Sequence, residues 1–234
     1  MDVKKADGFR FLPVDGPFSA GVAAEPGFDI VRVHVPYHTP LARGFEMIEQ
    51  AIRRSHRPMK SLCALELRVP KQYNRTDWAE FNAGYVAQWK RWEATVDGRI
   101  PGARTNVAPE VDPPHEPCLH AFCYTMQAER GGEDFVISGA PEPAGTQGGL
   151  AAYWAAIAKE LETRMTALAV TWDGATETQL YATRADHELF ASHDLTRFKE
   201  LVRPGLRWFF SRPPVEGLNI EVDVRRLTSE LWVS

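Results

Sequence analysis

The stretch RIPGARTNVAPEVDPPHEPCLHAFCYT, residues 99–125, decides the fold of this chain. A Pro-Gly turn precedes Arg104, and a proline-rich hairpin then leads into an alternating strand that contains His120. A second copy, PGLRWFFSRPPVEGLNIEVDV in residues 204–224, places Arg207 after the same turn and before a similar hairpin and strand. Because turn, arginine, hairpin and strand recur in one order, the sequence indicates an internal duplication.

The segments around each copy show the same order of hydrophobic patterns. Alternating or β-branched runs predict strands, and apolar residues at helical spacing predict helices. In the first half the predicted strands are 27–37, 61–70 and 118–125, and the predicted helices are 40–55 and 76–94. In the second half the predicted strands are 133–141, 177–183 and 219–224, and the predicted helices are 149–170 and 195–202.

The repeat divides the chain near QAERGGED, residues 127–134, which is rich in glycine and charge and has no apolar periodicity. We therefore predict an α+β fold with two tandem domains, residues 1–129 and 130–234. Each domain is expected to be a β-α-β-α-β unit whose mixed sheet carries its helices on one face.

Composition and charge limit the class of protein. Of the 234 residues, 44% are hydrophobic and 25% are charged, which is typical of a soluble globular protein. The net charge of -4, without a basic run, argues against nucleic acid as a partner. The first residues lack an apolar signal region and no run of about 18 apolar residues occurs, so we expect no membrane partner and a cytoplasmic location.

The cysteines and histidines do not form a pattern typical of disulfides or metal sites. The three cysteines include no Cys-x-x-Cys pair, so reduced, structural thiols are expected at Cys63, Cys118 and Cys123. Pro36 lies between His34 and His38 and prevents a helical metal-binding pair. The sequence therefore predicts no metal site.

Short motifs follow one another in a characteristic order along nearly the whole chain. They are GPFSAGVA (16–23), FNAGY (81–85), PGARTNV (101–107), VISGAPEP (136–143) and the two hairpins with their final strands. Together they resemble the Rid superfamily, the reactive intermediate deaminases that are also called YjgF-like proteins, in two tandem copies. The resemblance implies a chorismate-mutase-like fold, ligand clefts between neighbouring domains, and a homo-oligomer, with a trimer favoured.

The resemblance also implies roles for two pairs of residues. In such proteins an arginine holds the substrate carboxylate, and this arginine falls on Arg104 in the first half and on Arg207 in the second. A glutamate on the final strand handles the water. It falls on Glu221 in the second half, whereas His120 stands at the aligned position of the first half.

Four further residues are implied as substrate-binding: Phe18, Asn82, Ser138 and Gly139. The Ser-Gly pair occurs only in the second half, because the first half has Val35-Pro36 there, and the aromatic loop occurs only once. Two interpretations remain open. Either one complete kind of site is assembled from both halves, or one site works and the other is degenerate.

The chemistry of these residue types agrees with the implied activity. Arginine offers a fixed fork of donors to a carboxylate, and a carboxyl or imidazole group can move the protons of a hydrolysis without a cofactor. The expected function is therefore hydrolysis of the imine or enamine form of a small unsaturated amino acid, which releases ammonia and an oxo acid. The double-length form resembles the 2-aminomuconate deaminase type.

Other interpretations compete with this one. The first alternative is a non-catalytic protein that binds or senses a small carboxylate on the same scaffold. A ribonuclease or translation inhibitor is disfavoured by the acidic charge. Each candidate residue also has an ordinary explanation, such as a solvated loop arginine or a buried strand histidine. The face of helix 76–94 that is rich in tryptophan is expected to be core or oligomer interface.

Overall fold

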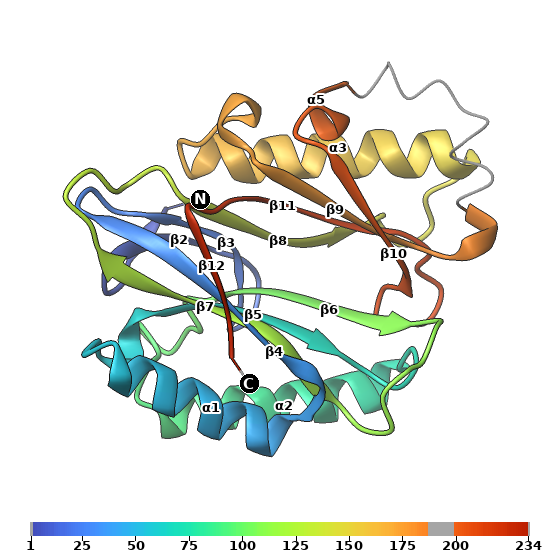
Figure 1. Cartoon of the computed structure of the whole chain (residues 1–234). Helices are drawn as coiled ribbons and strands as arrows, with labels where there is room; N and C mark the ends of the chain where they lie inside the picture. The colour runs from blue at the N-terminus through green and yellow to red at the C-terminus, as the bar shows by residue number, and fades with distance from the viewer. Residues whose placement is uncertain (1, 187–198, 234) are drawn as a thin grey trace.

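The computed structural model describes residues 2–186 and 199–233, which form two similar halves with their sheets between two outer layers of helices (Figure 1). The N-terminal half contains β4 (Phe28–Pro40), α1 (Leu41–Arg54), β5 (Leu62–Arg68), α2 (Arg75–Arg91), β6 (Ala103–Pro109) and β7 (Cys118–Gln127). The C-terminal half repeats this order with β8 (Phe135–Pro141), α3 (Gly149–Ala167), β9 (Glu177–Ala182), α5 (Lys199–Val202), β10 (Leu206–Arg212) and β11 (Glu221–Arg226). Of the predicted helix 195–202, residues 195–198 lie outside the described residues.

The strand order confirms the duplication. The N-terminal half has the order β6-β5-β7-β4 and the C-terminal half has the order β10-β9-β11-β8. In the N-terminal half β5 and β6 are parallel, and in the C-terminal half β9 and β10 are parallel. Parallel neighbours need a crossover connection, and α2 and α5 lie in these two connections. Each half thus has one strand more than the predicted β-α-β-α-β order, and this extra strand begins directly after the Pro-Gly turn and contains the arginine of the motif.

The terminal strands cross the predicted boundary between residues 129 and 130. The remaining strands are β1 (Lys4–Lys5), β2 (Phe9–Pro13), β3 (Ser19–Ala24) and β12 (Ser229–Trp232). Strand β3 pairs with β8 of the C-terminal half, and β12 pairs with β4 of the N-terminal half. Strands β6 and β10 also pair, so the twelve strands found in the described residues form one continuous sheet. The division into domains 1–129 and 130–234 stays a prediction.

Helices cover the outer face of each half (Figure 1). The buried residues of α3 recur at helical spacing and pack on the inner strands of the C-terminal half: Leu150, Trp154, Ile157, Leu161 and Met165. In the other half, Trp89 of α2 is fully buried with Leu65 and Phe122 of the sheet. The tryptophan-rich face of α2 is therefore partly core, as expected, at Trp89.

The two halves meet through a charged network between their sheets. Glu66 of β5 accepts hydrogen bonds from Arg32 of β4, at 2.7 Å, and from Arg225 of β11. Arg225 also lies 2.8 Å from Asp223 Oδ1. Burial alone would raise the pKa of Glu66, but the guanidinium groups of Arg225 and Arg32 outweigh it and hold this pKa well below its usual range.

This network predicts a large stability effect at Glu66. The substitution Glu66→Gln leaves two guanidinium groups, each 1% exposed, without their shared carboxylate. We expect the free energy of unfolding to fall by about 3 to 5 kcal/mol, as measured by urea denaturation. The control is Glu46→Gln, which makes the same chemical change in a surface pair whose side chains are 59% and 61% exposed and should cost less than about 1 kcal/mol. Equal losses in the two variants would contradict a stabilising network.

Within the described ranges, no helix is both long and apolar enough to cross a membrane. The three cysteines are buried and form no disulfide. In the same part of the chain, no group of three or more His, Cys, Asp or Glu side chains is arranged to hold a metal ion.

Candidate active site

Arg104 stands in a pocket of aromatic rings under α2. In β6 it is in register with Leu65, so its side chain lies on the helix-covered face of the sheet. Its guanidinium carbon is 4.3, 4.8 and 5.2 Å from the ring centroids of Phe18, Tyr85 and Trp78. Cation–π attraction therefore holds the guanidinium group in place.

The polar contacts of Arg104 leave most of its donors free. Nη1 donates a hydrogen bond of 2.8 Å to Oδ1 of Asn82, and among the described residues no carboxylate forms an ion pair with Arg104. Burial lowers the pKa of this guanidinium, although arginine remains a cation in proteins. A partly buried cation without a protein carboxylate is suited to bind an anion from solution.

The second wall of the site is the Ser-Gly segment of β8. Ser138 Oγ accepts a hydrogen bond of 3.1 Å from the backbone N–H of Arg104 and donates one of 2.9 Å to Ser19 O. The register of β8 and β11 shifts here, so residues 138–139 lie opposite Asp223 alone. This β-bulge takes two residues out of the regular ladder, and Arg164 Nη1 donates to the carbonyl of Ser138 at 2.9 Å.

Glu221 at the start of β11 packs directly on this bulge. A Cβ atom at Gly139 would overlap Glu221 Oε1, so any larger residue here would displace the carboxyl group from its present position. Glu142 fixes the approach to β11, because its carboxylate accepts hydrogen bonds from the backbone N–H groups of Asn219, at 2.6 Å, and Ile220, at 3.0 Å. The position of Glu221 is thus set by the backbone bonds of Glu142 just before β11 and by the contact with Gly139.

The surroundings of Glu221 keep its carboxyl group protonated at neutral pH. Burial is the largest cause that raises the pKa of Glu221 to about 8, and the charge of Asp223 raises it further. The nearby charge of Arg104 opposes this shift and does not cancel it. A carboxyl group with this pKa can donate a proton near pH 7 and can take one back.

Six of the eight predicted site residues come together in this place. Phe18, Asn82 and Arg104 come from the N-terminal half, and Ser138, Gly139 and Glu221 come from the C-terminal half. The arrangement corresponds to the interpretation in which both halves contribute to one complete site. The roles of these residues in binding and catalysis stay predictions.

Arg207 is not equivalent in position to Arg104, although both follow a Pro-Gly turn. It is in register with Gln179, whose side chain contacts the charged network between the halves, so it lies on the opposite face of its sheet. Its side chain is 59% exposed, and Nη1 lies 3.3 Å from Glu177 Oε1. Arg207 therefore already has a carboxylate partner.

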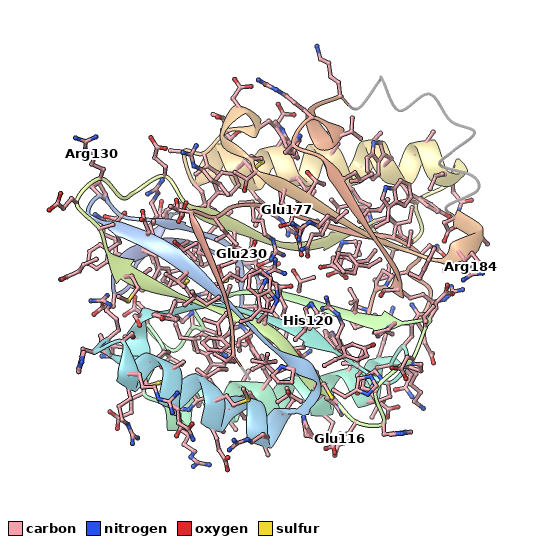
Figure 2. All side chains as sticks on the ribbon, in the orientation of Figure 1. Glu116, His120, Arg130, Glu177, Arg184 and Glu230 are labelled. Atoms are coloured by element: carbon pink, nitrogen blue, oxygen red, sulfur yellow. The ribbon has the colours of Figure 1, made fainter. Side chains whose placement is uncertain are left out.

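His120 also lies outside the pocket of Arg104. It stands opposite residues 35–38, which leave the ladder between β4 and β7, and its ring meets that of His34 edge-on at 6.3 Å. Burial, assisted by the charge of Arg68, lowers the pKa of His120 to about 3, so its imidazole is neutral. Figure 2 shows His120, Glu177 and Glu230 in the interior, between the two outer layers of helices. The predicted catalytic roles of His120 and Arg207 stay predictions.

The proline hairpin of the second copy, residues 212–218, contacts the N-terminal half beside the site. Gln72 Nε2 donates to three carbonyls of this hairpin, at Pro213, Val215 and Leu218, over 2.9 to 3.0 Å. A cavity of about 410 Å³ lies between this hairpin and the segment that contains Tyr73. The ring of Tyr73 stacks on that of Trp78 at 6.1 Å, so this cavity borders the aromatic pocket.

Sequence reasoning did not assign Trp78, Tyr85 and Arg164 to the site. A signal existed for the first two, because residues 78, 82 and 85 follow the helical spacing i, i+4, i+7 and therefore share one face of α2 with Asn82. No sequence pattern marks Arg164, whose role depends on backbone carbonyls of another strand.

Comparisons with known proteins show which family this chain resembles. A family model described as 2-aminomuconate deaminase CnbZ matches residues 1–231. A 2-amino-5-chloromuconate deaminase from Comamonas testosteroni is 34% identical in an alignment of 240 positions that covers 95% of each chain. A chorismatase crystal structure aligns with 96% of this chain and 79% of its own, with a TM-score of 0.45 and 12% identity. A member of the YjgF/YER057c/UK114 family from Mycobacterium tuberculosis aligns with 42% of this chain and 82% of its own, with a TM-score of 0.27 and 16% identity.

Proposed function

The chain belongs to the 2-aminomuconate deaminase family whose model it matches, and from this premise we propose that it hydrolyses 2-aminomuconate or a close relative through the imine tautomer. The observation that carries the proposal is that two groups, Arg104 and Glu221, both adjoin the Ser138–Gly139 segment. Arg104 is a cation without a carboxylate partner among the described residues, and Glu221 is a carboxyl group whose pKa is raised to about 8.

Binding starts at Arg104. Its free N–H groups donate hydrogen bonds to the carboxylate beside the amino-bearing carbon of the substrate, and the rings of Phe18, Tyr85 and Trp78 exclude water from the planar diene. This contact places the reacting C–N bond next to Glu221. Positioning of this kind supplies much of the rate increase that hydrolysis of a reactive imine needs.

Glu221 then moves the protons. The neutral carboxyl group protonates the enamine carbon, so the amino group becomes an iminium ion and Glu221 becomes a carboxylate. This carboxylate takes a proton from water as the water oxygen attacks the C=N carbon. Glu221 returns the proton to the nitrogen, ammonia leaves, and the hydroxyl proton goes back to Glu221 as the C=O bond forms. One water is consumed, and an oxo acid and one ammonia are released.

The direct test is turnover of 2-aminomuconate by purified protein. We expect its absorbance to decay faster than in buffer, with one ammonia released per molecule lost, and the rate to persist after dialysis against a chelator. Heat-denatured protein is the control for spontaneous decay. If absorbance falls only at the buffer rate while the protein still binds the compound in calorimetry, the non-catalytic alternative replaces the enzyme.

A further inference from the structure

Arg68 is a buried arginine that reaches from one half of the molecule to the other. It stands at the end of β5, two residues after Glu66, so both side chains point toward the C-terminal half. Its guanidinium carbon lies 5.6 Å from the ring centroid of Tyr181 and 5.8 Å from that of Phe209. These two rings stack on each other at 5.1 Å and form a flat platform under the guanidinium group.

Apart from these rings, this guanidinium has few polar partners for so buried a cation. Arg68 is 4% exposed, and its Nη1 donates only to the backbone carbonyl of the adjacent Leu67, at 3.1 Å. Nη2 is buried and has no hydrogen-bond partner, and across residues 2–186 and 199–233 no carboxylate forms an ion pair with this side chain. A buried cation whose donors are unused is costly for the fold and is typical of a binding group.

The strand register places Arg68 beside the candidate active site. Tyr181 of β9 is directly opposite Glu221 of β11, so the ring under Arg68 is the lateral neighbour of the Glu221 side chain. The charge of Arg68 also opposes the rise in the pKa of Glu221, which agrees with the closeness of the two side chains. Arg164 acts on the same carboxyl group, but its guanidinium is already bonded to Ser138 O and Glu160.

We propose that Arg68 binds the distal carboxylate of a dicarboxylate substrate while Arg104 binds the carboxylate next to the reacting C–N bond. The proposal rests on the proposed function and specifies it, because it selects six-carbon dienes with two acid groups over those with one. Arg207 is unsuited to this role, since it is largely exposed and lies 3.3 Å from Glu177.

The test compares two inert ligands that differ by one carboxylate. We choose trans,trans-muconate and sorbate, which share the six-carbon diene, and measure their dissociation constants by calorimetry. We expect wild type to bind muconate about 10- to 100-fold more tightly than sorbate, as a charge-assisted hydrogen bond contributes. The variant Arg68→Met should bind both ligands equally, with sorbate affinity within about 3-fold of wild type. The control is Arg43→Met on the surface, where the preference should remain.

The outcomes separate this inference from the proposed function. A wild type that fails to distinguish muconate from sorbate overturns the role of Arg68, and so does a variant that loses affinity for both ligands equally. Should Arg68→Met fail to fold by circular dichroism, Arg68→Gln, which keeps a donor for the carbonyl of Leu67, is expected to lose the preference instead. Because binding is measured without turnover, failure of 2-aminomuconate hydrolysis would reject the enzyme and leave this comparison valid.

Discussion

Replacement of Arg104 by methionine is expected to lower kcat/KM for 2-aminomuconate by about 10²- to 10⁴-fold. The loss follows from two charge-assisted hydrogen bonds to the substrate carboxylate, each of which contributes about 1.5 to 3 kcal/mol. The measurement is the initial rate of ammonia release at subsaturating substrate. Arg104→Lys should recover only part of the loss, because an ammonium group cannot form the bidentate contact and its shorter reach disturbs the contact with Asn82.

The substitution Arg104→Met should not destabilise the protein. Arg104 contributes a partly buried charge that no described carboxylate neutralises, so an apolar side chain among the rings of Phe18 and Trp78 removes a cost of desolvation. We therefore expect the urea midpoint of Arg104→Met to equal or exceed that of wild type. A variant that loses activity only in proportion to a lower midpoint would show that Arg104 acts through the fold, which contradicts a role in binding.

The duplication and most elements follow from the sequence, because turn residues and hydrophobic periods are local signals. The hydrophobic pattern did not predict the strand β6. Arg104 faces the helices, and Thr105 donates a hydrogen bond to Asp223 of the other half. Polar residues on both faces do not give the apolar–polar alternation of a half-buried strand. The trimer and the cytoplasmic location stay predictions.

The site was harder to predict where it depends on register. The motifs around Arg104 and Arg207 match in sequence, yet one arginine pairs with Leu65 and the other with Gln179, on opposite faces. A shift of one residue in register reverses the face of every side chain, and the turn sequence does not encode that shift. Arg68 gave no signal either, because the rings that hold it, Tyr181 and Phe209, belong to the other half.

Replacement of Glu221 by glutamine should abolish most turnover, by about 10²- to 10⁴-fold in kcat, because an amide cannot donate and recover a proton as a carboxyl group does. The shape of the side chain is kept, so binding of muconate should change little. In wild type we expect kcat to fall as the pH rises above about 8, where Glu221 loses the proton that starts the reaction. A rate that stays constant from pH 7 to 9.5 would contradict this role.

The same variant should be more stable than wild type at alkaline pH. The pKa of Glu221 is raised from its ordinary value of 4.5 to about 8 in the folded chain. Between these two values the unfolded chain releases this proton while the folded chain keeps it, so wild-type stability falls as the pH rises through that window. Glutamine has no proton to lose. The urea midpoints of Glu221→Gln and wild type should therefore coincide near pH 4.5 and separate by pH 8.5, by a free energy of about a few kcal/mol in favour of the variant. Parallel midpoints across this range would mean that Glu221 is ionised in the folded protein and acts as a base from the start.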